Sequence, residues 1–116
     1  MKILRRRFAF AAFSLATSAC AGVNTPSDVT GAIPITIEVI GINGARSFSP
    51  NPETIPPGHP VVWHNANIET HHIVFDDRSV DTGTLRPGAS SAPMPIGTSG
   101  PYHCTIHPSM VGTIAR

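Results

Sequence analysis

Apolar and polar residues alternate along residues 33–40, which read Ile-Pro-Ile-Thr-Ile-Glu-Val-Ile. This period of two predicts a strand with one buried face, because successive side chains of a strand point to opposite sides. The residues that share the apolar face are Ile33, Ile35, Ile37 and Val39. Shorter apolar runs bounded by Gly, Pro, Asn or Asp predict four more strands, which cover residues 61–63, 73–75, 102–104 and 111–115.

Turn-forming residues punctuate the rest of the chain. The sequence holds 12 Pro and 10 Gly in 116 residues, and no window after residue 20 has helical periodicity. Short strands separated by turns are typical of an all-β sandwich, and this length suffices for one domain. We therefore predict a single all-β sandwich, with Trp63, the only tryptophan, anchoring its core.

Residues 1–20 have the features of a secretory signal peptide. A basic start precedes an apolar run over residues 8–16, which is too short to span a bilayer. Two cleavage sites stay open: a lipobox-like Ser-Ala-Cys that would leave Cys20 lipidated, or a neighbouring small-residue site. Residues 21–32 are small and polar, which predicts a flexible tether before a domain that covers 33–116.

Removal of that signal leaves an acidic domain. Four Arg and seven Asp or Glu remain after it, which give a net charge of −3 with histidine neutral. An acidic chain without a basic patch argues against a nucleic-acid partner. If Cys20 is removed or lipidated, Cys104 is a lone thiol outside the cytosol, where metal ligation would protect it from oxidation. A disulfide between the two cysteines is the alternative on count alone.

Metal-binding residue types cluster near the C-terminus, in Cys104-Thr-Ile-His107-Pro-Ser-Met110. A histidine pair, His71 and His72, lies upstream, just before an apolar run. One cysteine, two histidines and a methionine are the ligand set of a type 1, or blue, copper site. Thiolate favours Cu(I) and imidazole suits Cu(II), so this set predicts a one-electron carrier.

Several motifs occur in a fixed order along residues 33–116. In that order they are Phe48-x-Pro50, Gly58-x-x-Val61-x-Trp63-x-Asn65, His71-x-Ile73-Val74-Phe75-Asp76, Pro87-Gly88 and Tyr102-x-Cys104-x-x-His107-x-x-Met110-x-Gly112. This series resembles that of the cupredoxins of the plastocyanin/amicyanin type. The spacing of Cys, His and Met in its last motif is that of the short ligand loop of amicyanin.

The resemblance implies a Greek-key β-sandwich that holds one type 1 copper ion. The implied ligands are His71, Cys104, His107 and Met110, with the methionine as a weak axial donor. It also implies an electron carrier rather than an enzyme, which docks with redox protein partners. A copper chaperone or storage module of the same fold is the alternative. A copper enzyme would need a second copper centre and added domains.

Strand parity separates the two adjacent histidines. His71 shares a face with Phe75, which is expected in the core, so His71 points inward and His72 outward. The sequence predicts surface positions for the remaining histidines, His59, His64 and His103, and leaves open an accessory metal role for these and for His72.

The signal peptide also predicts where the protein acts. We expect a periplasmic or otherwise extracytoplasmic protein, attached to a membrane only if Cys20 carries lipid. We expect the domain to be a monomer.

Overall fold

The computed structural model describes residues 32–116. The predicted signal peptide, Cys20 and the predicted tether up to residue 31 therefore lie outside the described residues. Within the described part, no helix has both the length and the apolar character needed to cross a membrane.

Eight strands and one short 3-10 helix, η2, make up the domain. Their bounds are β1 (Ile35–Val39), η2 (Gly44–Ser47), β2 (Phe48–Ser49), β3 (Glu53–Thr54), β4 (Val61–Asn65), β5 (His71–Phe75), β6 (Asp81–Leu85), β7 (Gly100–Cys104) and β8 (Val111–Ala115).

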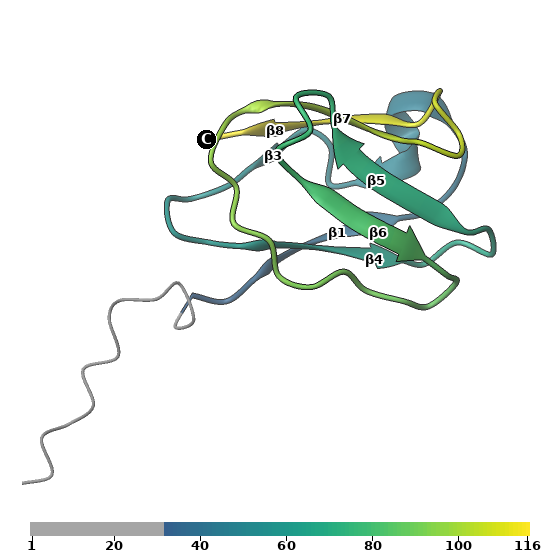
Figure 1. Cartoon of the computed structure of the whole chain (residues 1–116), viewed down its shortest axis with the longest axis horizontal. Coiled ribbons are helices and arrows are strands. Elements are labelled where there is room, and N and C mark those ends of the chain that lie inside the picture. Colours follow the sequence, from purple (N-terminus) through teal and green to yellow (C-terminus); the bar gives the residue numbers. More distant parts are fainter. Residues whose placement is uncertain (1–31) are drawn as a thin grey trace, which may run out of the picture.

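The strands form two sheets that pack face to face (Figure 1). One sheet has the order β2-β1-β4 and the other β3-β8-β7-β5-β6. The β1–β4 and β3–β8 pairs are parallel, and the remaining neighbours are antiparallel. The predicted all-β Greek-key sandwich is confirmed. The loop between β7 and β8 lies at the opposite end of the sandwich from the C-terminus (Figure 1).

All five predicted strands are present, with one correction at the first. Ile33 is 78% exposed, and β1 begins only at Ile35, where its N–H donates to the carbonyl of Pro60. Pro34 has no N–H to give to a ladder, which is why pairing starts after it. Strand β6 is an edge strand with a single buried side chain, Leu85, so its sequence shows no apolar alternation.

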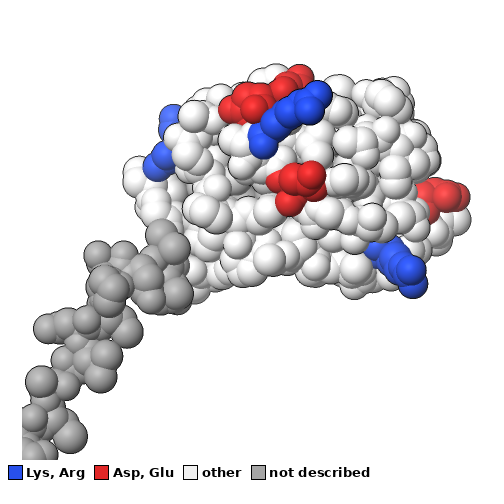
Figure 2. Space-filling view, in the orientation of Figure 1, with Lys and Arg blue, Asp and Glu red and all other residues white. Residues whose placement is uncertain are grey.

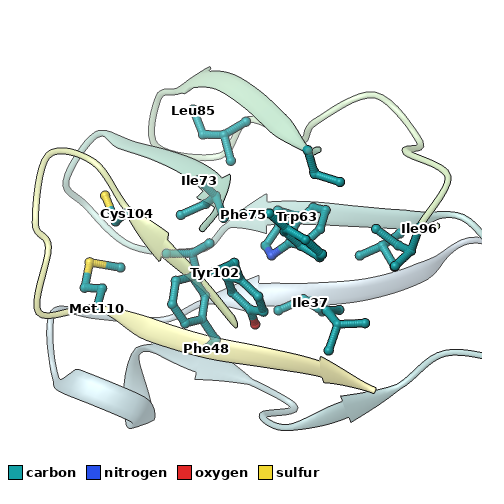
Figure 3. Close-up of a cluster of buried hydrophobic side chains, with 14 of the residues drawn as sticks. Ile37, Phe48, Trp63, Ile73, Phe75, Leu85, Ile96, Tyr102, Cys104 and Met110 are labelled. Carbon is teal, nitrogen blue, oxygen red and sulfur yellow. The ribbon is translucent and has the colours of Figure 1, made fainter. Parts of the chain in front are cut away.

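An aromatic cluster fills the space between the sheets (Figure 3). Trp63, Phe75 and Tyr102 are at most 1% exposed. The ring of Tyr102 lies 5.6 Å from that of Trp63, edge to face, and 5.9 Å from that of Phe75, stacked. Such pairs stabilise a core beyond the area they bury. The prediction that Trp63 anchors the core is confirmed.

The ring of Tyr102 packs against Gly112. The two residues are paired across β7 and β8, and a Cβ at Gly112 would lie 2.2 Å from Cζ of Tyr102. The ring therefore lies directly on the backbone of the neighbouring strand. This contact packs β7 against β8 close to the loop that joins them.

Candidate metal centre

Three metal-binding side chains meet at the end of the sandwich that holds the β7–β8 loop. One donor atom from each of His71, Cys104 and His107 lies within 4.8 Å of the other two. His71 is the first residue of β5, Cys104 is the last of β7, and His107 lies in the following loop. His71 and Cys104 are fully buried, whereas His107 is half-buried.

The distances between the donor atoms fit a site for one metal ion. The Sγ atom of Cys104 lies 3.7 Å from Nδ1 of His71 and 3.8 Å from Nδ1 of His107. A metal about 2.3 Å from a thiolate and about 2.0–2.1 Å from an imidazole would separate the two donors by about 3.8 Å at trigonal angles and about 3.6 Å at tetrahedral ones. The spacing therefore suits one metal ion held by all three donors, and a thioether beside them favours copper over zinc.

Met110 lies beside this group of three. Its side chain is fully buried, and Figure 3 shows the sulfur atoms of Cys104 and Met110 at the same end of the core. The N–H of Met110 donates to the carbonyl of His107 at 2.9 Å, and its carbonyl accepts from the N–H of Cys104 at 3.1 Å. These two bonds close the loop, which explains how seven residues bring three donor types to one end of the core.

Asn67 orients the buried histidine. The amide oxygen of Asn67 can only accept, so Nε2 of His71 donates to it at 3.2 Å and Nδ1, which faces the Cys104 sulfur, is the nitrogen available to a metal. The same oxygen accepts the N–H of Glu69 at 3.0 Å, so it is held in place. A hydrogen bond on the distal nitrogen fixes the tautomer and ring orientation of a ligand histidine.

Asn65 fixes the turn that carries Asn67. Its fully buried amide donates to the carbonyls of Glu69 at 2.7 Å and Leu85 at 2.9 Å, and its Oδ1 accepts the N–H of Asn67. The sequence analysis missed these roles. The signal that could have found them is the run Asn65-x-Asn67-x-Glu69 just before His71, since asparagine side chains commonly bond the backbone two residues on.

Burial favours the neutral form of His71. Desolvation in the core, and then the nearby His107, lower the pKa of this imidazole, while Glu69 opposes them. A histidine must be neutral to bind a metal. The environment of His71 therefore prepares it for ligation.

We predict that Asn67→Ala weakens copper binding by about 10–100-fold, the usual cost of losing a partner of a ligand histidine. Asn67→Asp keeps an oxygen for Nε2 of His71 and should restore most of the affinity. Competition with a copper chelator measures both. Wild-type affinity in Asn67→Ala would show that the bond to His71 has no part in holding the site.

The other histidines lie on the surface, and three of them pair with carboxylates. The outward position of His72, predicted from strand parity, is confirmed. The three pairs are His64–Glu38, His72–Asp81 and His103–Asp76. His59 also lies near the surface, with Nδ1 3.0 Å from the carbonyl of Ile33. None of these four belongs to the donor group at the end of the sandwich.

Comparison with known proteins identifies the fold. A purple cupredoxin from Nitrosopumilus maritimus aligns with a TM-score of 0.60 and 24% identity, over 69% of this chain and 96% of that one. An oxidised amicyanin variant aligns with a TM-score of 0.58 and 16% identity, over 78% of this chain and 93% of that one. No family model and no curated protein match the sequence.

A copper-containing nitrite reductase from Thermus scotoductus also aligns, with a TM-score of 0.59 and 26% identity. The match covers 71% of this chain but only 22% of that enzyme, so the likeness is to one part of it. This chain thus has the cupredoxin fold. The donors at the end of its sandwich fit one type 1 copper ion.

Proposed function

We propose that the protein carries single electrons between redox partners outside the cytoplasm by cycling one copper ion between Cu(I) and Cu(II). The equatorial ligands are His71, Cys104 and His107, and Met110 is the weak axial ligand. The observation that supports this most strongly is the nearly equal separation, 3.7 and 3.8 Å, of the Cys104 sulfur from the two imidazoles. When bound, copper supplies the one-electron couple.

The protein's own residues would keep the site dry and the donors fixed. His71, Cys104 and Met110 are fully buried, so water is excluded from all but the His107 side. Two of these donors belong to paired neighbouring strands, since Cys104 in β7 lies across from Ile73 in β5. A rigid sheet restrains ligand movement when the charge on the metal changes, which favours fast electron transfer.

A carrier must hold its metal in both redox states, and this separates it from a chaperone or store. We expect a reversible one-electron wave for the copper-loaded protein on an electrode. We also expect copper to stay bound when the reduced protein meets a Cu(I) chelator of moderate strength. Rapid release on reduction, without a reversible wave, would favour the chaperone or storage function instead.

Electrons would enter and leave through the half-buried His107. Exposed apolar side chains surround this end of the sandwich: Ile106 is 50% exposed, and Ile68, in the loop before His71, is 84% exposed. Ile40 adjoins that loop, since its carbonyl accepts from Asn67. Weak redox encounters use small interfaces, which an apolar patch around a ligand edge can provide.

We predict that Ile106→Glu or Pro108→Glu slows electron self-exchange by about tenfold or more, because two copies would bring like charges together. The visible spectrum should change little. Ile33→Glu is the matched control, since Ile33 is 78% exposed and precedes β1 at the other end of the sandwich. Unaltered exchange in both loop variants, measured by NMR line broadening, would mean that electrons leave through another surface.

Met110 should influence the reduction potential of the copper ion without being needed for copper binding. Met110→Leu removes a donor that Cu(II) needs more than Cu(I), so the potential should rise. Met110→Gln supplies a harder oxygen that favours Cu(II), so the potential should fall. We expect each shift to be on the order of 60 mV, a tenfold change in the equilibrium constant for one electron. Voltammetry measures both, and shifts of the same sign would show that Met110 is not the axial ligand.

The N-terminal sequence supports the proposed location outside the cytoplasm and the proposed lipid anchor. A signal peptide over residues 1–20 supports export, and lipid on Cys20 would attach the domain to a membrane through residues 21–32. We propose export and lipid attachment, and also a monomeric state, in which the His107 end of the sandwich is free to contact protein partners.

A further inference from the structure

The outer face of the five-stranded sheet carries a hollow of about 390 Å³. Its polar lining residues are His72, Asp76, Arg78, Asp81, His103 and Thr105, so two carboxylates face one guanidinium across it. Figure 2 shows acidic side chains on this face of the molecule, with a basic side chain directly beside their largest cluster. The hollow is separate from the donor group of His71, Cys104 and His107, which lies between the sheets.

Two histidine–carboxylate pairs line this hollow. Nε2 of His72 lies 2.5 Å from Oδ1 of Asp81, and Nδ1 of His103 lies 2.6 Å from Oδ1 of Asp76. The two imidazole side chains are 30% and 33% exposed, and the two carboxylates 60% and 51%. All four side chains are therefore open to solvent and to an arriving ion.

The strand register brings the two pairs together. Val74 lies opposite Asp81 on β6 and opposite His103 on β7. His72 lies across from Thr105, whose N–H donates to its carbonyl. His72 and His103 are thus diagonal neighbours on adjacent strands, with Cα atoms about 7–8 Å apart, within reach of long side chains. Val74, which is paired with His103, also lines the hollow.

The chemistry of these side chains suits a borderline divalent cation. Imidazole nitrogen and carboxylate oxygen are common ligands of Zn²⁺, and imidazole also binds Cu²⁺. The N–H of Gly83, and then His72, lower the pKa of Asp81, so this carboxylate is ionised at neutral pH. Asp81 therefore offers a charged oxygen next to the first imidazole.

We propose that this outer hollow binds one divalent transition-metal ion through His72, His103 and Asp81, with Asp76 as a further oxygen donor. In the described part of the chain, only the inner group already has three such donors within 4.8 Å of one another. An ion in the outer hollow would therefore replace the hydrogen bonds of the two pairs and draw the exposed side chains inward over Val74.

The outer site would influence the inner one across a single strand layer. His72 directly follows the inner ligand His71, and His103 directly precedes Cys104, with the side chains on opposite faces of the sheet. A cation bound outside would disfavour Cu(II) more than Cu(I), so the potential of the inner copper should rise. This effect on the potential rests on the proposed function, whereas binding in the hollow does not.

Zinc titration of the copper-loaded full-length protein tests the site, because copper keeps zinc out of the inner position. We expect one Zn²⁺ per chain by calorimetry and metal analysis, with the visible band retained. His72→Gln and His103→Gln should each weaken zinc binding by more than the roughly 10–100-fold cost of losing an outer partner. His64→Gln is the matched control, since it breaks a similar pair with Glu38 on the other sheet.

Three results would overturn the proposed site: no zinc bound, zinc bound equally well by both histidine variants, or zinc lost in only one of them. If either histidine variant fails to fold, Asp81→Asn and Asp76→Asn take its place, and loss of zinc in Asp81→Asn is the result that the proposal requires. Zinc binding without a rise in potential would contradict the link between the two sites. Zinc stoichiometry is measured without any redox experiment. A failure of the proposed outer site can therefore be distinguished from a failure of the proposed electron transfer.

Discussion

Replacing Cys104 by serine should abolish the intense visible absorption of the copper-loaded protein. In the structure, the Cys104 sulfur is the one donor that faces both imidazoles, at 3.7 and 3.8 Å. The strong colour of a type 1 site comes from charge transfer along the copper–thiolate bond, which a hydroxyl oxygen does not provide. We expect weak copper binding through the two histidines and loss of the band.

The serine variant should still fold, because the change replaces one buried small side chain by another of similar size. Near-ultraviolet circular dichroism of the buried Trp63 provides the control, since it reports packing between the sheets. A well-folded serine variant that stays intensely coloured would mean that the thiolate is not a ligand.

His71→Ala should also disrupt the copper site, as Cys104→Ser does, whereas His72→Ala should leave it intact. His71 is fully buried with Nδ1 turned to the Cys104 sulfur, so its loss removes an equatorial donor. We expect copper affinity to fall by more than the roughly 10–100-fold that loss of an outer partner costs. His72 points out of the sheet toward Asp81, so its alanine variant should keep the visible band with a modest shift. Chelator competition and absorption spectra measure both.

If His72, and not His71, proves necessary for copper binding, strand β5 is displaced by one residue from the register described above. A strand displaced by one residue turns every side chain to the opposite face. Loss of copper in His72→Ala, with a normal site in His71→Ala, would therefore contradict the observed pairing of Ile73 with Cys104.

Much of the fold and site could be predicted because their signals are local. Alternation placed β1, and the parity of β5 assigned His71 inward and His72 outward, which the burial of these residues confirms. The tight spacing of Cys104 and His107 placed them in one loop, and the structure brings both to His71. Each of these inferences needs only the period of a strand and the reach of a short loop.

The rest depends on contacts between distant segments. Strand β6 has little apolar sequence and exists because its backbone pairs with β5 at the sheet edge. Strands β2 and β3 are two residues long and are defined only by their partners β1 and β8. The role of Asn67 follows from the contact of its amide oxygen with Nε2 of His71, which a sequence pattern does not reveal.

The absorption spectrum of the copper-loaded protein, oxidised with ferricyanide, tests the central claim most directly. A trigonal site of His71, Cys104 and His107 with axial Met110 predicts an intense band near roughly 600 nm that disappears on reduction. Only weak absorption from the oxidised, copper-loaded protein would contradict a copper–thiolate bond, and with it the proposed electron carrier.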